Sequence, residues 1–437
     1  MKKILLLNYY WPPSGGSAVQ RWLDITNNLE KLDVQTYVIT IDEKCATFPF
    51  IDETLNGRIA GTTKVFKTGS SELFYLYNLI TGKKKDKFDE RVVNKTKDSF
   101  VGKVSRFVRG NFFIPDPRKG WNPHAYKKAV EIINTYKIDI VFTAGPPQST
   151  HLIGLKLKKH FPDIKWIADI HDFWTDIYIL KSFYRTKLAH YFDKKLESKV
   201  LHTANMIMTH SRSSKMIFEN KLKPGIDKNK IFVYTMGFNE TLFQRQENAL
   251  AQKEFIIFYS GILSKKNKAE FFLRIFKELV DANPVFPIKL KFAGSIYKEL
   301  IDDIQSLSLE NHVEYLGYLS HETLVKKLYE STALLLINPF FEDEKYHVPG
   351  KLYEYIAAYK PIISISSKDS ENEAIIHECN AGKNFDWNEM EQLKKHLSQL
   401  MAQWMQSKNI DLPLNANVHK YGRFYETKKL KEIIAGL

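Results

Sequence analysis

A lysine and a glutamate three residues apart, Lys351 and Glu354, form the pair best suited to chemistry in this sequence. They follow Pro349 and Gly350, which open a predicted helix, and their spacing places both on its exposed face while Leu352 starts its buried side. A cation beside a helix N-terminus suits a diphosphate. A carboxylate one turn later can accept hydrogen bonds from both hydroxyls of a ribose. A simple surface ion pair has the same spacing, so both functions stay open.

A second candidate is His171, which lies between Asp169 and Asp172 just after a predicted strand at 165–169. A histidine at a strand end can hydrogen-bond a sugar hydroxyl or transfer a proton, although a structural histidine fits the same position. The sequence contains no HxxxH, CxxC or DxD run. We therefore expect no metal site and no cofactor.

Two glycines, Gly15 and Gly16, follow the first predicted strand at 4–7. Glycine lets a backbone approach a ligand closely, and the N–H groups of the next helix can bind a phosphate. Arg21 in that helix can reach such a phosphate or pair with Asp24. Many turns of this type carry glycine only for the turn.

Predicted strands and helices alternate through the chain, and the series restarts near residue 255. The first series of strands covers 4–7, 35–41, 139–143, 165–169, 206–209 and 231–234, and the second covers 255–259, 289–292, 313–316, 333–337 and 361–366. Such alternation favours parallel sheets with helices on both faces, and ligands bind at the carboxyl ends of their strands. We therefore predict an α/β chain with two Rossmann-like, doubly wound domains facing a central cleft.

The composition fits a globular protein of two domains. The 437 residues exceed one ordinary core, and 44% hydrophobic with 26% charged residues excludes disorder as the default. The two cysteines, Cys45 and Cys379, lie far apart, which favours a reducing compartment. No secretory signal or membrane-spanning run is visible, so we expect a cytoplasmic location.

The net charge of +14 is concentrated in the first half of the chain. Residues 1–250 hold 40 Lys and Arg against 25 Asp and Glu, whereas the remainder holds 24 against 25. This charge attracts an anionic partner such as nucleic acid, a phospholipid surface or a phosphorylated substrate, or it simply aids solubility. Residues 81–128 carry 14 cations and 5 acids with aromatics between them. Within them, 101–109 form a predicted amphipathic helix that either lies on an anionic bilayer or covers the first sheet.

Taken together, these residues resemble the retaining glycosyltransferases of family 4, which have the GT-B fold, over most of the chain. The matching motifs are Gly15-Gly16, His171, the Gly-x-Leu turn at Gly261, the strand ending at Gly317 and the helix with Glu354. The segment 113–121 looks like members that build bacterial surface polysaccharides.

The resemblance implies an acceptor-binding domain at 1–240, a nucleotide-sugar domain at 241–420 and a C-terminal segment, 421–437, that packs back on the first domain. It implies catalytic roles for His171, Lys351 and Glu354. The donor-binding residues it implies are Gly15, Gly16, Ser260, Gly261, Gly317, Tyr318, Pro349, Gly350 and Leu352, and those on the acceptor side are Asp116, Arg118, Trp121 and Asp172.

Two departures from the family pattern concern the charged residues. The first of its two glutamates is Tyr346 here, with Glu342 and Glu344 out of register. Its Arg and Lys phosphate clamp falls on Ile262 and Asn267, so Lys351 would supply the positive charge, with Lys265, Lys266 or Lys268 contributing.

By resemblance, the chain moves a sugar from a nucleotide-diphosphate sugar to a glycan or lipid-linked acceptor, with retention of configuration. The basic first domain leads us to expect an acceptor at the inner face of the cell membrane, with peripheral attachment and no nucleic acid. A GT-B nucleotide-sugar epimerase and a non-catalytic basic binding protein remain open, because fold alone excludes neither.

Overall fold

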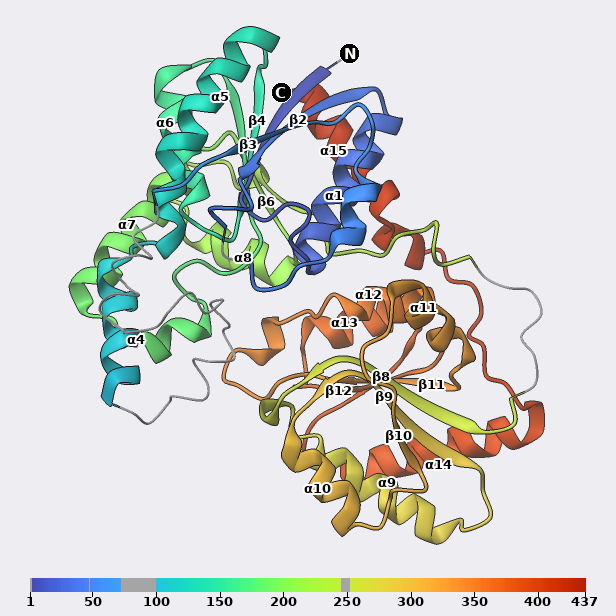
Figure 1. Cartoon of the computed structure of the whole chain (residues 1–437). Coiled ribbons are helices and arrows are strands. Elements are labelled where there is room, and N and C mark those ends of the chain that lie inside the picture. Colours follow the sequence, from blue (N-terminus) through green and yellow to red (C-terminus); the bar gives the residue numbers. More distant parts are fainter. Residues whose placement is uncertain (1, 47, 72–99, 245–251) are drawn as a thin grey trace. The chain divides into compact units, whose positions relative to one another are not determined.

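The computed structural model describes residues 2–46, 48–71, 100–244 and 252–437. It divides into two compact units (Figure 1). Unit 1 comprises Met1–Met236 together with Glu426–Leu437, and unit 2 comprises Gly237–Tyr425. The chain thus passes from unit 1 into unit 2 and returns for its last helix.

Unit 1 is built on a seven-stranded parallel sheet in the order β3-β2-β1-β4-β5-β6-β7. Its strands are β1 (Lys2–Asn8), β2 (Val34–Ile41), β3 (Lys64–Thr68), β4 (Ile140–Gly145), β5 (Lys165–Ile170), β6 (Met206–Thr209) and β7 (Ile231–Val233). Its helices are α1 (Ser17–Lys31), α4 (Phe100–Phe112), α5 (Asn122–Tyr136), α6 (Thr150–His160), α7 (Lys187–Thr203), α8 (Arg212–Asn220) and α15 (Arg423–Gly436), and the 3₁₀ helices η2 (Pro117–Trp121) and η3 (Tyr178–Phe183) matter below.

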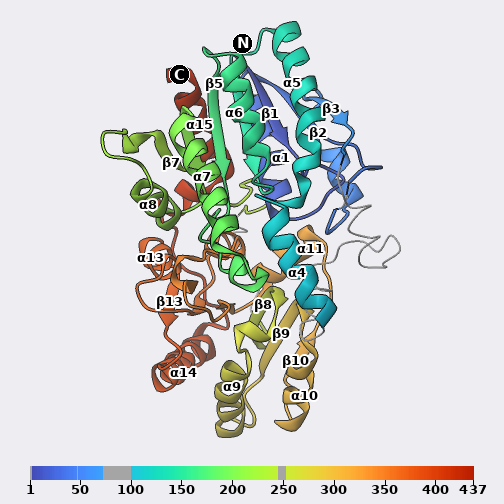
Figure 2. The same cartoon turned by 90° about the vertical axis from the view of Figure 1, so that its left-hand side faces the viewer.

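The alternation of side chains along β1 explains how this sheet is covered. Ile4 and Leu6 point to one face, where they pack with α1 and α15, while Leu5 and Leu7 point to the other, where α5 and α6 lie. Figures 1 and 2 show these two helical layers on opposite sides of the strands. Both faces are buried, which is why residues 4–7 of this strand are all hydrophobic.

Unit 2 repeats the plan with a six-stranded parallel sheet in the order β10-β9-β8-β11-β12-β13. Its strands are β8 (Phe255–Leu263), β9 (Ile288–Ile296), β10 (Val313–Tyr315), β11 (Ala333–Ile337), β12 (Ile362–Ile365) and β13 (Gly382–Phe385). Its helices are α9 (Glu270–Ala282), α10 (Lys298–Ser306), α11 (His321–Glu330), α12 (Lys351–Ala357), α13 (Glu371–Glu378) and α14 (Met390–Ser407), with the 3₁₀ helix η6 (Glu344–Tyr346) in the loop before α12.

The helices of unit 2 also form two layers, with α9, α10 and α14 on one face of the sheet and α11, α12 and α13 on the other (Figure 1). The strand order reverses between β8 and β11, as it does between β1 and β4 in unit 1. Ligands of open α/β sheets bind outside the carboxyl ends of strands at this reversal. The expectation of two Rossmann-like domains in an α/β chain is confirmed.

The sequence pattern missed two strands, β3 and β13. Both lie at the edge of their sheets, and their sequences, KVFKT and GKNF, mix apolar with polar residues. An edge strand exposes part of its surface to water, so it lacks the continuous hydrophobic run of a central strand.

The last helix, α15, completes unit 1. Its Leu430 and Ile434 are fully buried in the core that contains β1. The Glu426 carboxylate accepts hydrogen bonds from the Thr235 backbone N–H at 2.7 Å and from its hydroxyl at 3.0 Å.

Within the described ranges, no helix combines the length and apolarity needed to cross a membrane.

Candidate functional site

Lys351 lies against the carboxyl end of β8, the strand at the order reversal of unit 2. Its Nζ donates to the Ser260 carbonyl at 2.8 Å and lies 3.8 Å from the centre of the Tyr259 ring. No Asp or Glu in the described part of the chain forms an ion pair with it. Burial without a carboxylate partner lowers the pKa of Lys351 to about 7. The site therefore holds a cation that an anionic ligand would stabilise.

Glycines keep the space in front of this lysine open. Gly261 and Gly294 are paired in register on β8 and β9, and both have a φ of 112°. A Cβ at Gly294 would come within 2.3 Å of the Gly261 carbonyl oxygen, and a Cβ at Gly261 would lie 3.3 Å from the Lys351 Nζ. The contact excludes a side chain at Gly294, and at both positions the φ is one that residues with a Cβ rarely adopt.

Ser260 connects β8 to α12 through three hydrogen bonds. Its backbone N–H donates to the Tyr355 hydroxyl at 2.9 Å, its Oγ lies 3.2 Å from the same oxygen, and its carbonyl accepts from Lys351. These groups are used within the protein, so the structure places Ser260 as a support for Lys351. Burial raises the pKa of Tyr355, which stays a neutral phenol.

Glu354 lies one turn after Lys351, and its carboxylate is held by a histidine that the sequence pattern did not indicate. His321 Nε2 is 2.8 Å from Glu354 Oε1, and both side chains remain partly accessible. His321 is the first residue of α11 and follows the loop after β10 by a few residues. The imidazole contact leaves the second carboxylate oxygen available to a ligand. The position of His321 just after Gly317-Tyr318 is the signal that could have found it.

The loop after β10 supplies Gly317 and Tyr318. The Gly317 carbonyl accepts from the Gly294 N–H at 2.7 Å, and its φ is 66°. Tyr318 is 87% exposed, so its ring is free to stack on a planar base. Pro349 and Gly350 start the turn into α12, where their carbonyls accept from Leu352 and Tyr353.

Leu352 does not join this surface, because its side chain is fully buried in the core of unit 2. Only its backbone could approach a donor, and its N–H already donates to Pro349.

The two departures from the family pattern have structural explanations. Glu344 is buried in η6, where it accepts from Asn338 Nδ2 at 2.6 Å and from the Ser367 hydroxyl at 2.6 Å, so it fixes the loop before α12. Asn267 accepts from the Ser264 N–H at 2.9 Å and donates to the Ile337 carbonyl at 2.9 Å. Neither side chain is available to a phosphate or a sugar. Tyr346, also in η6, is partly exposed.

The other candidate cations of unit 2 interact elsewhere. Lys265 pairs with Glu299 at 3.3 Å, and Lys268 Nζ lies 3.3 Å from the centre of the Phe340 ring. Lys351 is thus the described lysine whose ammonium contacts Ser260 beside Gly261.

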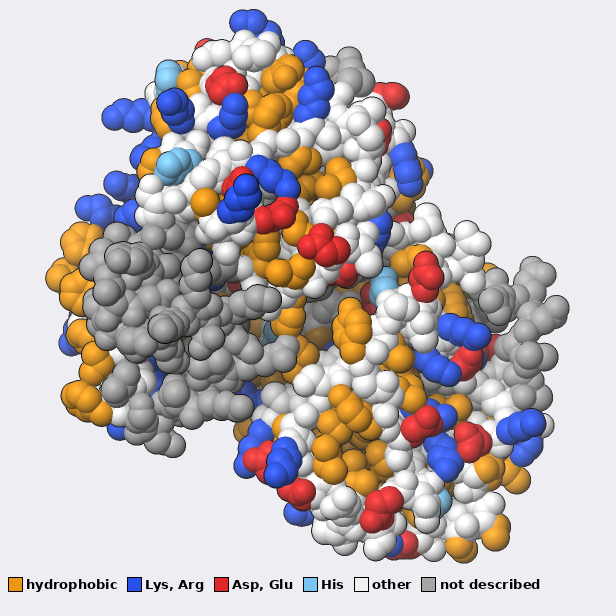
Figure 3. Space-filling model, viewed as in Figure 1, with side chains coloured by type: hydrophobic (Ala, Val, Ile, Leu, Met, Phe, Trp, Pro, Cys, Tyr) orange, Lys and Arg blue, Asp and Glu red, His pale blue; other side chains and the backbone are white. Residues whose placement is uncertain are grey.

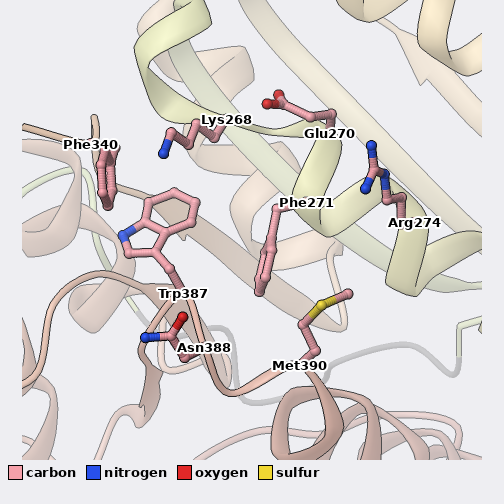
Figure 4. A pocket seen from close by; sticks show the side chains of 8 residues that line it. All are labelled: Lys268, Glu270, Phe271, Arg274, Phe340, Trp387, Asn388 and Met390. Carbon is pink, nitrogen blue, oxygen red and sulfur yellow. The ribbon is translucent and has the colours of Figure 1, made fainter.

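A separate cavity of about 390 Å³ lies beside the start of α9. Figure 4 shows Phe340, Trp387 and Phe271 side by side along it, with Lys268, Glu270 and Arg274 at its rim and Asn388 and Met390 below. None of the predicted donor residues lines it.

The corresponding region of unit 1 is filled by a buried ion pair. Arg21 Nη1 donates to Asp169 Oδ2 at 2.8 Å, and Trp22 Nε1 donates to the same oxygen at 2.8 Å. Arg21 also donates to the Tyr234 carbonyl at 3.0 Å, and both charged side chains are 1% exposed. The sequence-based roles of Arg21 are therefore wrong: it binds Asp169 instead of a phosphate, and Asp24 pairs with Arg58.

His171 lies beside this pair. It lines a small cavity of about 30 Å³ with Asn8, Gly145, Arg21 and Asp169, and its ring centre is 4.7 Å from that of His210.

Of the two loop glycines, Gly15 donates its N–H to the Phe50 carbonyl at 3.0 Å, whereas Gly16 is exposed with open space around it. Only Gly16 presents free backbone surface.

Three of the four predicted acceptor-side residues serve the fold of unit 1. Trp121 is fully buried and donates from Nε1 to the Thr68 hydroxyl at 2.9 Å. Asp116 accepts from the Ser149 N–H at 2.6 Å and from the Arg118 N–H at 2.9 Å, so it joins η2 to α6. Arg118 is buried as well. The structure therefore contradicts an acceptor contact for the Trp121 ring, because no part of that ring reaches the surface.

Asp172, the fourth, is partly exposed, and its carbonyl accepts from Gln148 Nε2 at 3.3 Å. In the described ranges, no three His, Cys, Asp or Glu side chains lie close enough together to hold a metal ion.

Comparisons with known proteins bear on the whole arrangement. Residues 240–425 match the family model for glycosyl transferases group 1, which covers nearly all of unit 2 and includes Lys351 and Glu354. No curated protein sequence matches the chain.

Solved structures resemble the chain over its full length at low sequence identity. Sucrose-phosphate synthase from Thermosynechococcus elongatus has a TM-score of 0.65 and 12% identity, covering 100% of this chain and 99% of that one. The lipopolysaccharide outer core galactosyltransferase WaaB has a TM-score of 0.57 and 13% identity, covering 100% of both chains. TarM has a TM-score of 0.61 and 12% identity, covering 99% of this chain and 98% of its own. At this identity the likeness shows the fold, which is GT-B.

The two findings support a GT-B glycosyltransferase. The part of the chain that matches the family model lies in unit 2. The side chains of Lys351, Glu354 and His321 lie in this unit, at the carboxyl side of its sheet.

Proposed function

We propose that this glycosyltransferase is a retaining enzyme of family 4 that takes its sugar from a nucleotide-diphosphate sugar bound to unit 2. The observation that carries the proposal is the pair formed by Lys351, a cation without a carboxylate partner, and Glu354, a carboxylate with one oxygen available. Tyr318 would stack on the base, Glu354 would accept from the ribose hydroxyls, and Lys351 would bind the diphosphate.

The chemical task of the site is to stabilise the leaving diphosphate. The bond between the sugar C1 and the phosphate oxygen breaks, and its electron pair leaves on the diphosphate. The acceptor hydroxyl forms the new bond to C1 and passes its proton to an oxygen of the departing diphosphate. Lys351 would neutralise the charge that develops on the diphosphate, as a preorganised cation does in other transfer reactions. Retention requires the acceptor to attack from the face that the diphosphate leaves.

The structures of two neighbours support a uridine nucleotide as the first donor to test. One is a mutant of TarM from S. aureus in complex with UDP, and the other is described as trehalose-6-phosphate from E. coli bound with UDP-2-fluoro glucose. We further propose a metal-independent reaction on a glycan or lipid-linked acceptor in surface-polysaccharide synthesis, in the cytoplasm at the inner face of the membrane.

The test is the thermal stability of the chain with UDP, GDP, ADP, CMP and dTDP sugars. One of them should raise the melting temperature of the wild type and should have no such effect on Glu354→Ala. Glu391→Ala is the matched control, because it removes an exposed glutamate from the first turn of α14 in the same unit. Absence of a shift with every nucleotide would contradict the proposal.

A second experiment separates the transferase from an epimerase of the same fold. The UDP-GlcNAc 2-epimerase from Methanocaldococcus jannaschii has a TM-score of 0.51 and 12% identity to this chain, so the fold accommodates both reactions. The donor that stabilises the chain should be consumed only when an acceptor glycan is added. Isomerisation of the donor without an acceptor would favour the epimerase, and binding of polynucleotide instead of any donor would favour a basic binding protein.

A further inference from the structure

Hydrophobic side chains gather on the outside of unit 1 over two helices, α4 and α7. Of the twenty large hydrophobic residues that are exposed in the described ranges, seven lie here, with Phe100 81% and Leu188 65% exposed. They are Phe100, Val104, Phe107 and Phe112 of α4 and Leu188, Tyr191 and Phe192 of α7, and we call them the α4–α7 surface. Single exposed hydrophobic residues are normal in proteins, but a cluster on adjacent elements marks an interaction site.

The way α4 is attached explains why its apolar side faces outward. Gly110 packs so tightly on η3 that a Cβ there would come within 2.5 Å of the Phe183 carbonyl oxygen. Asn111 accepts from the Thr186 N–H at 2.7 Å and donates to the Tyr184 carbonyl at 3.1 Å. The Gly110 carbonyl in turn accepts from Arg185 Nε at 3.0 Å. Polar contacts thus fix α4, and its phenylalanines are left without a place in the core.

The apolar residues of α7 share one side of their helix. Leu188, Tyr191 and Phe192 are spaced i, i+3 and i+4, which places them on one stripe. The opposite side of α7 packs inward through Ala189, Val200 and Leu201. The outward stripe is therefore a second apolar surface on the same helix. A helix that only covers a core has one apolar side and a polar side toward solvent.

The exposed charges that the described residues of these two helices carry all have one sign. The sequence of α4 contains no acid, and the two acids of α7 point inward: Asp193 accepts from Trp174 Nε1 at 2.7 Å, and Glu197 accepts from Lys221 Nζ at 2.7 Å. The exposed charged residues of the two helices are the lysines at 103, 187, 194, 195 and 199. Figure 3 shows hydrophobic and cationic side chains along the edge where α4 and α7 lie in Figure 1.

We propose that the α4–α7 surface binds an anionic phospholipid bilayer. Aromatic and aliphatic side chains next to lysines match the interface of such a bilayer, where apolar groups enter the acyl boundary and lysines meet the phosphates. A second copy of this surface fits less well, because its lysines would meet lysines. Only the biological role of this binding, which is to bring the enzyme to a lipid-linked acceptor, rests on the proposed function.

The experiment is co-sedimentation of the full chain with vesicles of phosphatidylcholine alone or mixed with phosphatidylglycerol. The wild type should sediment with the anionic vesicles at low salt, and a smaller fraction of it should sediment with them at high salt. It should not sediment with vesicles of phosphatidylcholine alone. The variant Leu188→Ser/Tyr191→Ser/Phe192→Ser should bind at least tenfold more weakly. The variant Lys194→Glu/Lys195→Glu should weaken binding in the same direction, and it tests the charge separately from the apolar residues.

A matched control removes three exposed hydrophobic residues from unit 2, with Val285→Ser, Ile301→Ser and Leu414→Ser, and should bind vesicles like the wild type. The proposal is overturned if the wild type does not sediment with anionic vesicles, or if the α7 triple variant still binds as well as the wild type. It is also overturned if light scattering shows a wild-type dimer that the triple variant dissociates, because the surface would then bind a second copy.

The two proposals fail separately. Stabilisation by nucleotide sugars measures unit 2, and vesicle binding without any nucleotide measures the α4–α7 surface. A triple variant that is stabilised by the donor like the wild type, but no longer sediments with vesicles, would show that the two sites are independent.

Discussion

Each of the two sheets places a cation beside its central strand, buried in unit 1 and partly buried in unit 2, and the two cations are in opposite states. Arg21 in unit 1 has a carboxylate, two backbone carbonyls and an aromatic ring around it. Lys351 in unit 2 has one carbonyl and one ring. A buried charge whose partners are all supplied by the protein serves the fold, whereas a partly buried charge that lacks a counter-charge is suited to a ligand that brings one.

The largest expected effect comes from breaking the satisfied pair. Asp169→Asn would leave the Arg21 charge buried without compensation, and it should lower the free energy of unfolding by about 3–5 kcal/mol. Urea unfolding followed by fluorescence measures this loss. Glu131→Gln is the control, since it breaks an exposed pair with Lys128 and should change stability by less than about 1 kcal/mol. If the two changes lowered the free energy of unfolding equally, the buried pair of Arg21 and Asp169 would contribute no more to stability than an exposed pair.

The reverse result is expected for Lys351→Met. Removing a cation that has no carboxylate partner should leave the free protein as stable as before or more stable. It should raise the Kd for the nucleotide sugar about 10- to 100-fold, because a hydrogen bond to a charged group contributes about 1.5–3 kcal/mol. Isothermal titration calorimetry measures the affinity, and Lys326→Met removes an exposed lysine as the control. Loss of stability without loss of affinity would refute the contrast between the two cations.

The same lysine should make binding depend on pH. With a pKa of about 7 in the free protein, Lys351 is increasingly neutral above pH 7, and the diphosphate binds the protonated form. The affinity should therefore be constant below about pH 7 and fall by up to about tenfold per pH unit above it. Lys351→Met should lose this dependence, and a wild-type affinity that is flat up to pH 9 would contradict the low pKa.

The free energy of unfolding should change with pH in the direction opposite to the affinity. Because folding lowers the pKa of Lys351 below its ordinary value, the unfolded chain binds more protons above pH 7. The stability of the wild type relative to Lys351→Met should therefore be lowest below pH 7 and rise as the pH increases from 7. Urea midpoints of the two proteins across this range measure the difference.

The smallest effect is expected at His321. His321→Ala removes the partner of one Glu354 oxygen, and it should raise the Kd of the donor about 2- to 10-fold, as expected for one hydrogen bond of about 0.5–1.5 kcal/mol. Preference for the ribose nucleotide over its 2′-deoxy form should also shrink. His377→Ala changes an exposed histidine of α13 and should do neither. Unchanged ribose preference would show that His321 does not position Glu354.

The positions of the central strands and of the helix that carries Lys351 and Glu354 could be predicted from the sequence, because each of these elements depends on residues close together in the chain. Contacts across the chain could not be predicted in this way. Arg21 and Asp169 are 148 positions apart, and no local pattern distinguishes an arginine that pairs with such a carboxylate from one that awaits a phosphate. His321 and Glu354 are 33 positions apart and meet only because the fold of unit 2 brings the starts of α11 and α12 together.

The acceptor-side prediction shows a second limit. Trp121, Asp116 and Arg118 have the residue types of a sugar-binding loop, but the same types are used here to close the end of β3 and to start α6. Aromatic and acidic residues near a strand end serve both purposes, and only their burial distinguishes the two. The helix predicted at 101–109 was real, whereas its apolar side could be placed only once its neighbours η3 and α7 were known.

The return of the chain to unit 1 has a consequence for the order in which the protein is made. Unit 2 is complete when residue 425 has been synthesised, but unit 1 still lacks α15 and, with it, the two side chains that close the core around β1. The half of the molecule that is translated first is therefore finished last. Until then, the part of the sheet that Leu430 and Ile434 cover beside α1 remains exposed at the ribosome, where chaperones could bind it.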